Sequence, residues 1–373
     1  MTYHIFVYGL LLRLINIIFG KNGVSQDIKS VSDTPSITVL CAAFNEEKHI
    51  EEKIKSFLAL NYPADKINMI VISDDSIDAT NDIVQQFKAS NVELVVQKPR
   101  RGKQCAYNLV MPSITTDYVL STDANSIFEP EAINHLVTAM MNNSKIGIVS
   151  GELVLRKPGS KDSGEGLYWK YESFLKNQES TFESIIGANG SIFLIKRELF
   201  TKIDPASVDD FERTMYVLSR GYIAKYVPAA IVYEDVTEIA MEEFSRKVRI
   251  VTQEWFALVR NIQLLNPFKH AKVSFMLISH KLIRWLLFLF AFLALLTTGL
   301  IKSPFYNVIF GIQVFFYIVG FIEVNLQKRD IRIPYANIIA YFVTMCAASL
   351  VAFVRFMFKQ NIGMWNPVRK DEG

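Results

Sequence analysis

The stretch "YVLSTDANSIFEP" (residues 118–130) passes from an apolar run into Asp123, Ala124 and Asn125. The apolar run predicts a buried strand, and polar side chains directly after a strand are typical of a ligand-binding sheet edge. Asp123 and Asn125 are two positions apart, so their side chains can reach the same point. Only Asp123 carries a negative charge, and Asn125 offers a neutral amide oxygen where a second carboxylate would bind a cation more strongly.

Upstream of this stretch, apolar runs alternate with segments of helical periodicity. Strands are expected at 37–44, 67–75 and 92–97, and helices at 45–60, 79–89 and 103–111. Strands that alternate with helices of this length imply a parallel sheet with helices on both faces. We expect Asn45 to cap the first helix, and Ser76 or Asp78 to cap the second.

Polar residues follow each of these strands. They are Asn45 and Glu46, then Asp74 and Asp75, then Arg101, Gly102 and Lys103, and finally Asp123 and Asn125. Singly, each has a plain structural interpretation, because acidic turns often cap helices and "RRGK" is typical of a solvated loop. Together at one edge, the acids suit a divalent cation and the bases suit phosphate. The pattern therefore predicts a site for a nucleoside diphosphate with Mg²⁺ or Mn²⁺.

The C-terminal quarter contains long apolar runs without a charged residue, at 285–301, 303–322 and 333–354. Each approaches or reaches the roughly 20 residues that span a bilayer. We expect about three membrane-embedded helices within 263–360, after a soluble domain at 35–262 and before a polar tail at 361–373. A set of buried helices in a large soluble protein is the alternative.

The N-terminal "HIFVYGLLLRLINIIFG" (4–20) is apolar but is interrupted by Arg13. Within residues 1–34 we expect a hydrophobic anchor or interfacial helix followed by a linker. It either crosses the membrane at a tilt or lies in the interface with Arg13 reaching for water. No small-residue cleavage site follows, so a cleaved signal peptide fits less well.

The distribution of charge bears on partners and on topology. A net charge of +3 is too small to indicate nucleic-acid binding. Lysines and arginines cluster at 260–272 and 327–332, which the positive-inside rule places on the cytoplasmic side with two crossings between them. A third crossing would put the basic tail outside, so the last run is either re-entrant or an exception to the rule. The three cysteines are scattered singly and predict no disulfide framework.

In order along the chain, these motifs resemble the inverting glycosyltransferases of family 2. The resemblance covers most of 35–260 and rests on "AAFNEE" (42–47), "SDDSIDAT" (73–80), "RRGKQCAYN" (100–108), "STDANSIFEP" (121–130), "GANGSIFLIKRELF" (187–200), "VDDFERT" (208–214) and "RKVRI" (246–250). It implies an α/β fold, with a GT-A (Rossmann-like) nucleotide-sugar transferase domain followed by a C-terminal transmembrane helical region. The apolar runs are similar to those of membrane-bound bacterial members such as cellulose and hyaluronan synthases.

The resemblance also implies roles for single residues. The nucleotide would be bound by Ala43, Asn45, Glu46, Asp74, Gly102, Lys103 and Asp123. Among these, Asp74 would contact the base. Asp123 and Asn125 would hold Mg²⁺ or Mn²⁺.

An inverting transfer needs one base to deprotonate the acceptor hydroxyl. Asp209 and Asp210 are the candidates, and alignment with the family motif favours Asp210. The structural alternative is that Ser207 or Asp209 caps the helix that follows.

Arg246 and Arg249 share one helical face and would stabilise the leaving diphosphate. The alternative for this pair is a basic stripe that faces anionic lipid. Polymerising relatives have Gln-x-x-Arg-Trp here, whereas this chain has Arg246 and Ile250, which argues against long-chain processivity without excluding it. Trp255 is either a core residue or a platform for a sugar. Three apolar runs make a thin bundle for a channel, so a second subunit or a synthase complex would have to supply further helices.

Three functions remain open at this point. The leading one is transfer from a UDP-sugar to a growing cell-surface or capsular polysaccharide, or another glycan or lipid-linked acceptor, on the cytoplasmic side of a bacterial inner membrane. The second is a polyprenyl-phosphate glycosyltransferase, whose anionic acceptor would favour a basic opening made by Lys269, Lys272, Lys281 and Arg284. The third is a catalytically silent scaffold subunit of a synthase complex.

Overall fold

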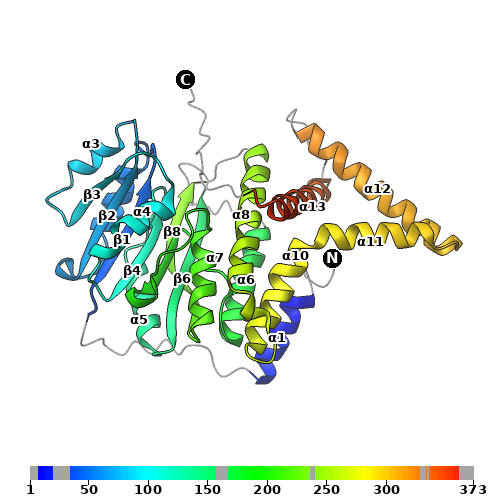
Figure 1. Cartoon of the computed structure of the whole chain (residues 1–373), viewed down its shortest axis with the longest axis horizontal. Coiled ribbons are helices and arrows are strands. Elements are labelled where there is room, and N and C mark those ends of the chain that lie inside the picture. The colour runs from blue at the N-terminus through cyan, green and yellow to red at the C-terminus, as the bar shows by residue number, and fades with distance from the viewer. Residues whose placement is uncertain are drawn as a thin grey trace.

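The computed structural model describes residues 7–19, 34–156, 167–235, 240–327, 333 and 336–360. Its centre is a sheet with the strand order β3-β2-β1-β4-β7-β6-β8-β5 (Figure 1). The strands are β1 (Ile37–Ala43), β2 (Ile67–Asp74), β3 (Val92–Gln97), β4 (Tyr118–Asp123), β5 (Ile127–Phe128), β6 (Ile146–Arg156), β7 (Ile192–Lys196) and β8 (Ile223–Asp235).

The first half of the sheet is parallel, as the alternation of strands and helices predicts. β1 pairs in parallel with both β2 and β4, and β2 pairs in parallel with β3. β7 then runs antiparallel to β4 and to β6, so the sheet as a whole is mixed. Since the carboxyl ends of β1, β2 and β4 lie at one edge, their terminal residues come together there.

Seven described helices form the layers on the two faces of the sheet, the last of them by packing on the helix before it. They are α2 (Ile50–Leu58), α3 (Thr80–Gln85), α4 (Lys103–Val110), α5 (Ala132–Met141), α6 (Leu167–Phe182), α7 (Asp209–Ser219) and α8 (Ala240–Arg260). Alternate residues of β1 face opposite layers, because side chains alternate along a strand. Leu40 belongs to the core shared with α4 and α7, whereas Val39 and Cys41 belong to the core shared with α2 and α5.

The turns after β1 and β2 differ from the expected caps. α2 begins after His49 without a side-chain cap, so the predicted cap by Asn45 is wrong. Asn45 instead has a left-handed backbone (φ 52°), and its Oδ1 accepts a hydrogen bond from the Ile77 amide at 3.0 Å. Asp78 Oδ1 accepts from the Thr80 amide at the start of α3, at 3.0 Å. The two turns therefore brace each other at the sheet edge.

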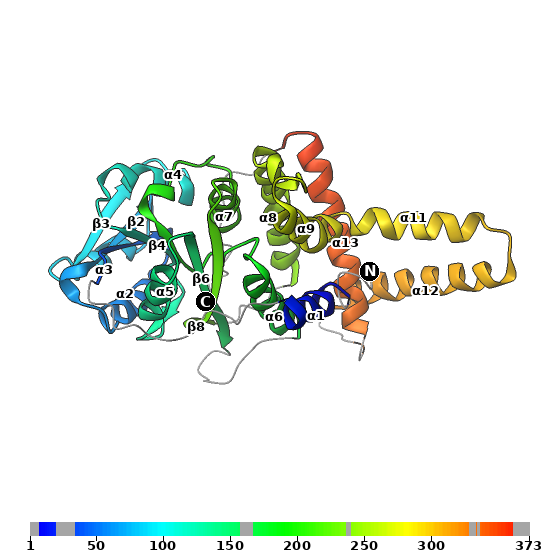
Figure 2. The same cartoon turned by 90° about the horizontal axis from the view of Figure 1, so that it is seen from below.

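Within the described residues, the three C-terminal apolar runs are largely helical. The elements are α9 (Ala271–Met276), α10 (Ile283–Trp285), α11 (Leu287–Leu300), α12 (Pro304–Gln327) and α13 (Ala336–Met357). Within the described chain, two helices are long and apolar enough to cross a membrane, at Pro304–Leu326 and Ile338–Met357. A third span results if Ala271–Trp285 and Leu287–Leu300, bent by 63°, count as one. Figure 2 shows α11 and α12 projecting side by side from the sheet domain, while α13 returns to pack against α8.

Near the N-terminus, α1 (Tyr8–Phe19) lies along α6 (Figure 2). Its inner face is fixed by the buried Tyr8 and Leu12, and Tyr8 Oη donates to Glu179 Oε1 at 2.7 Å. Its outer face exposes apolar side chains, including Ile17 and Phe19. A helix with one buried and one exposed apolar face suits the surface of a membrane, which is the interfacial alternative for this segment.

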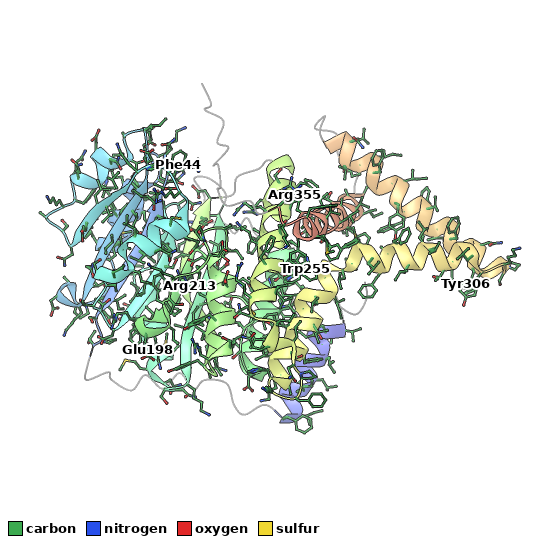
Figure 3. All side chains as sticks on the ribbon, in the orientation of Figure 1. Phe44, Glu198, Arg213, Trp255, Tyr306 and Arg355 are labelled. Carbon is green, nitrogen blue, oxygen red and sulfur yellow. The ribbon has the colours of Figure 1, made fainter. Side chains whose placement is uncertain are left out.

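Trp255 joins α8 to the C-terminal helices (Figure 3). Its ring centroid lies 5.0 Å from that of Trp285 and 5.5 Å from that of Phe356, and the side chain is 8% exposed. Trp255 is thus a core residue, and the interpretation as a sugar platform is wrong because its ring is already covered. The same hydrophobic cluster runs from the sheet to Ala352. It therefore continues past residue 262, where the sequence predicts the end of the soluble domain.

Candidate active site

The carboxylate that ends β4 is paired with a lysine from the start of α4. Lys103 Nζ donates to Asp123 Oδ1 at 2.7 Å. Gly102 precedes it with φ 89°, a backbone conformation that glycine adopts without strain. Burial tends to lower the pKa of Lys103, but the neighbouring Asp123 carboxylate holds that pKa well above its ordinary value. The predicted site residues Gly102, Lys103 and Asp123 therefore do converge at the sheet edge.

Asp74 organises the loop that leads to Lys103. Its Oδ1 accepts from Gln97 Nε2 at 2.5 Å and from the Arg101 amide at 2.9 Å. Its Oδ2 accepts from the Gly102 amide at 2.8 Å. The predicted base-binding residue is thus at the edge, with its carboxylate engaged by the loop.

Ala43, Asn45 and Glu46, at and just after the end of β1, are held in place by neighbouring residues. Ala43 is buried at the end of β1, and Glu46 is buried within 3.2 Å of His49 Nδ1. The Glu46 amide donates to Thr80 Oγ1 at 2.8 Å. With Asn45 bonded to the Ile77 amide, all three residues shape the edge. Their contact with a nucleotide stays a prediction.

The two acids of "VDDFERT" have different surroundings. Asp209 Oδ1 accepts from Arg213 Nε at 2.5 Å, and Asp209 Oδ2 accepts from Ser121 Oγ at 3.1 Å. α7 begins after Val208 without a side-chain cap, so the capping role expected of Ser207 or Asp209 is wrong. Both side chains are taken by other partners, since Ser207 Oγ accepts from Arg260.

Asp210 is the acid of this pair that forms no ion pair with a described residue. Among the described residues, only the adjacent Phe211 amide donates to its Oδ1, at 2.7 Å. A methyl group added at Gly190 would lie 3.3 Å from its Oδ2. Burial and the charge of Asp209 raise the pKa of Asp210 to about 6. A carboxylate with that pKa is ionised at neutral pH and is a better proton acceptor than an ordinary aspartate.

The two arginines of α8 are placed differently. Burial and the neighbouring Arg246 lower the pKa of Arg249, while the charges of Asp210 and Asp123 act in the opposite direction. The Arg249 guanidinium is therefore within electrostatic reach of both carboxylates. Arg246 lies on the exposed side of the helix. The structure brings Arg249 to the candidate site and leaves Arg246 at its margin.

A second network, not anticipated from the sequence, lies behind Asp123. Glu234, at the end of β8, accepts at Oε1 from Ser126 Oγ at 2.5 Å and from Ser191 Oγ at 2.6 Å. Ser191 Oγ is also 3.4 Å from Asp123 Oδ2. Burial, followed by the charge of Asp123, raises the pKa of Glu234. The strand-end rule that finds Asp74 and Asp123 also applies to the apolar run before Glu234.

Lys53 belongs to the same network. It is 0% exposed, and its ammonium donates to Thr122 Oγ1 at 2.7 Å and to the Ser126 carbonyl at 2.6 Å. In the sequence it lies three positions after Ile50 and four before Phe57, on the apolar face of its helix. That position was the available sign that this lysine is buried.

Asp123 and Asn125 are the predicted cation ligands. Their side-chain oxygens are ligands that Mg²⁺ and Mn²⁺ accept, and the Lys103 ammonium against Asp123 shows that the position attracts positive charge. Within the described chain, no cluster of three or more acidic, histidine or cysteine side chains makes a complete cation site. The donor set fits a cation whose remaining ligands come from a diphosphate and water.

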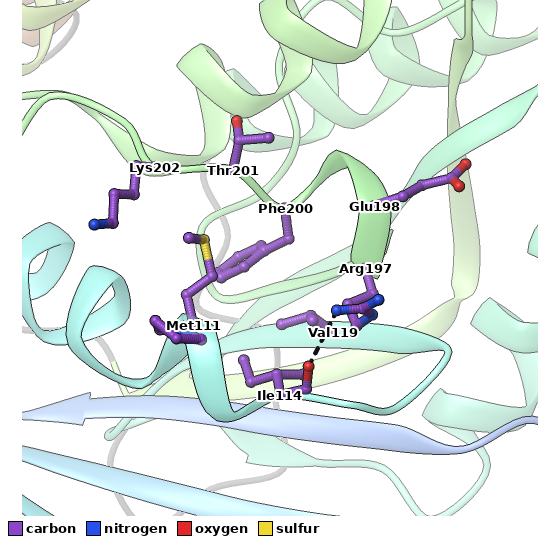
Figure 4. Close-up of a pocket in the computed structure, with 9 residues that line it drawn as sticks. Met111, Ile114, Val119, Arg197, Glu198, Phe200, Thr201 and Lys202 are labelled. Atoms are coloured by element: carbon purple, nitrogen blue, oxygen red, sulfur yellow. Dashed lines mark hydrogen bonds between the residues drawn. The ribbon is translucent and has the colours of Figure 1, made fainter.

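A separate surface cavity of about 350 Å³ lies near the other end of β4 (Figure 4). Val119, near the start of β4, is in its wall with Met111, Phe200 and Lys202. Arg197 closes one side and donates to the Ile114 carbonyl at 3.3 Å. None of the predicted site residues lines this cavity, so it is distinct from the sheet edge that carries Asp123.

Comparison with known proteins finds similarity to glycosyltransferases. Residues 38–204 match the family model described as glycosyl transferase family 2. A probable glycosyltransferase of Bacillus subtilis, YdaM, is 26% identical over 324 residues, or 80% of this chain and 72% of the relative. The poly-β-1,6-N-acetyl-D-glucosamine synthase of Staphylococcus aureus is 27% identical over 228 residues, which cover 59% of this chain and 55% of the synthase.

A solved structure shares the fold over nearly the whole chain. It is the mannosyltransferase PcManGT from Pyrobaculum calidifontis in complex with GDP-Man and Mn²⁺, with a TM-score of 0.69, 19% identity and 95% coverage of both chains. Residues 38–204 thus match glycosyl transferase family 2, the sheet domain has the GT-A fold, and the chain is a glycosyltransferase.

Proposed function

We propose that this protein is a membrane-bound inverting glycosyltransferase that transfers a sugar from a UDP-sugar to a growing cell-surface polysaccharide or another glycan. The observation that carries the proposal is that the site contains two carboxylates, one paired with a cation and the other without an ion-pair partner among the described residues. Asp123 is paired with Lys103 at 2.7 Å, and Asp210 has a pKa of about 6 and no ion-pair partner among the described residues. One suits the diphosphate side of a donor sugar and the other suits the acceptor side.

In this reaction Asp210 takes the proton of an acceptor hydroxyl while that oxygen attacks the anomeric carbon. The bond to the diphosphate breaks on the opposite face of the sugar, and its electron pair leaves with the nucleoside diphosphate. Lys103 and Arg249 stabilise the charge that develops on the leaving group. No covalent intermediate on the protein is needed, because one base suffices for inversion.

Asp123 and Asn125 would hold Mg²⁺ or Mn²⁺, which neutralises charge on a diphosphate when bound. The mannosyltransferase of similar fold was solved with Mn²⁺ and GDP-Man, and the synthase relative is named for an N-acetylglucosamine polymer. These relatives define the donors worth testing first, namely UDP-N-acetylglucosamine and GDP-mannose besides other UDP-sugars.

The membrane-side cations bear on the acceptor. Lys281 Nζ lies 2.6 Å from Glu254 Oε1. Arg284 and Lys272 are likewise paired with Glu172 and Glu183, whereas Lys269 is exposed. Paired cations have little capacity left for a lipid phosphate, so the contacts favour an acceptor that presents neutral hydroxyl groups over a polyprenyl phosphate. The arrangement of Asp123, Asp210 and Arg249 disfavours a catalytically silent scaffold, because a scaffold would have no need of these three side chains together.

The apolar helices give the protein its membrane association, with α13 packed on the catalytic domain through α8. We place the catalytic domain on the cytoplasmic side of a bacterial inner membrane, where nucleotide sugars are made. A second subunit or a synthase complex would complete any channel, since the described apolar helices form a small bundle.

The test is a nucleotide-release screen in membranes that contain the wild type, Asp210→Asn or the control Asp65→Asn. Asp65 is an exposed carboxylate in the turn before β2. We expect one donor to release nucleotide with the wild type and with Asp65→Asn, and not with Asp210→Asn. Absence of Asp210-dependent release from every donor would overturn the proposal. A polymer or oligosaccharide product supports the glycan acceptor, and a chloroform-soluble single-sugar lipid supports the polyprenyl phosphate.

A further inference from the structure

We infer that Glu234 supplies the second carboxylate of the cation site, in place of the acid that Asn125 lacks. This inference rests on the proposed function, because it concerns the same Asp123 site. It adds a ligand from β8, a strand that lies far along the chain from the Asp-Ala-Asn turn and outside that motif.

The geometry begins with a shared hydroxyl. Ser191 Oγ lies 2.6 Å from Glu234 Oε1 and 3.4 Å from Asp123 Oδ2. Two carboxylates that flank one hydroxyl group are immediate neighbours. Glu234 is also bonded to Ser126, the residue directly after Asn125, at 2.5 Å. Glu234 therefore lies against both ends of the Asp-Ala-Asn turn.

The orientation of Glu234 leaves one oxygen for a ligand. Both serine hydroxyls bond Oε1, and no donor among the described residues bonds Oε2. The Glu234 side chain is half-buried rather than fully buried at the end of β8. A carboxylate anchored through one oxygen and open at the other is well suited to bind a cation with little loss of side-chain freedom.

Lys53 holds the turn in this arrangement. Its buried ammonium bonds Thr122 Oγ1 on one side of Asp123 and the Ser126 carbonyl on the other, at 2.7 and 2.6 Å. Two adjacent carboxylates repel unless positive charge lies close. In the structure that charge comes from Lys53 behind the turn and from Lys103 on Asp123. A divalent cation is a stronger partner for two carboxylates than one ammonium group, and it would free Lys103 for the diphosphate.

The competing role for Glu234 is that of a hydrogen-bond acceptor that only anchors Ser126 and Ser191. Two substitutions separate charge from anchoring. Glu234→Gln keeps the acceptor oxygen and the side-chain length but removes the charge. Glu234→Asp keeps the charge but shortens the side chain by one methylene, which weakens the bonds to the serines. A cation ligand predicts tighter metal binding in Glu234→Asp, and an anchor predicts tighter metal binding in Glu234→Gln.

The experiment is a titration of the detergent-solubilised full chain with Mn²⁺ in the presence of UDP, with free Mn²⁺ read by electron paramagnetic resonance. We expect Glu234→Gln to weaken Mn²⁺ binding by roughly 10- to 100-fold, the range found when groups that support a metal site are removed. The control Glu93→Gln, at an exposed carboxylate on β3, should bind like the wild type. In the double variant Glu234→Gln/Asn125→Asp, the carboxylate is returned to the turn and binding should recover.

The outcomes separate this inference from the proposed function. Two results would overturn the role of Glu234 alone. One is a Glu234→Gln variant that binds Mn²⁺ as tightly as the wild type. The other is a double variant that does not recover Mn²⁺ binding, together with a Glu234→Asp variant that binds no better than Glu234→Gln. A wild-type chain that binds no Mn²⁺ with UDP would overturn the metal-assisted mechanism itself. If Glu234→Gln does not fold, the Mn²⁺ titration of Glu234→Asp tests the inference instead. A loss of Mn²⁺ affinity in Glu234→Asp as large as that in Asp123→Ala would contradict a charge-based role.

Discussion

Arg213 and Asp209 form a buried ion pair within α7, with 2.5 Å between Nε and Oδ1 and with side chains only 1% and 5% exposed. The guanidinium also donates from Nη1 to the Thr201 carbonyl at 2.8 Å. Because of this ion pair, the adjacent residues Asp209 and Asp210 have different roles. Asp209 holds α7 to β4 and to the loop before it, and Asp210 is left to face the site.

Removal of Arg213 should destabilise the fold. Arg213→Met leaves the Asp209 carboxylate buried without its cation, a change that costs about 3–5 kcal/mol in comparable buried pairs. The measurement is chemical or thermal unfolding of the purified protein in detergent. Arg220→Met, at an exposed arginine at the end of the same helix, is the control. Equal stabilities of the two variants would contradict the structural role of the pair.

Asp210 should govern the pH dependence of transfer. Its pKa is raised to about 6, so the basic form is present above that pH and is lost as the pH falls through it. We expect kcat/KM to fall about tenfold for each pH unit below 6, and Asp210→Asn to lower kcat by about 10²–10⁴-fold at neutral pH. A flat profile between pH 5 and 8, or an active Asp210→Asn variant, contradicts its assignment as base.

Gly190 should matter for the placement of Asp210. A methyl group at Gly190 would lie 3.3 Å from Asp210 Oδ2, closer than an ordinary contact, so the carboxylate must move. The required shift is a few tenths of an ångström. Since displacement of a reacting group by 1 Å can cost about 100-fold in rate, we expect Gly190→Ala to lower kcat by several-fold, with little change in stability. Gly187→Ala is the matched control, because its nearest neighbour is Phe211 Cδ2 at 3.6 Å. Equal rates for the two variants would show that Asp210 tolerates the shift.

Asp123 and Asn125 should respond differently to substitution. Asp123→Ala removes a negative charge and the partner of Lys103, so nucleotide release should be abolished. Asn125→Asp only adds a carboxylate oxygen to the same turn, and release should be retained. Release assays at saturating donor and Mn²⁺ test both variants. A fully active Asp123→Ala enzyme would refute the assignment of this residue to the cation and diphosphate.

Trp255 should be required for stability more than for chemistry. Trp255→Ala leaves a cavity among Trp285, Phe353 and Phe356, and truncation of a buried aromatic residue costs about 3–5 kcal/mol. Phe321→Ala on α12 is the control, since that side chain is 66% exposed. Unfolding in detergent measures both. A Trp255→Ala protein as stable as Phe321→Ala would show that α13 contributes little to the fold.

The strands β1 to β4 and the polar residues at their ends could be predicted from the sequence because each strand is a short apolar run followed by polar residues. The direction of β7 could not, since the side chains of a buried strand do not encode whether it runs parallel or antiparallel to its neighbour. The cap by Asn45 was wrong because its amide oxygen finds a partner 32 residues away, in Ile77. Lys53 and Glu234 were missed for the same reason, since their separations from Ser126 are 73 and 108 residues.

The continuous core around Trp255 has a consequence for how this enzyme can be divided. A chain cut after residue 262 would retain every residue assigned to the donor, the base and the diphosphate. It would also strip the aromatic cover from α8, the helix that carries Arg249. The sheet domain is therefore not a portable module that its apolar helices merely tether. A soluble truncated variant would need substitutions on α8 that replace the apolar contacts that α10 and α13 provide.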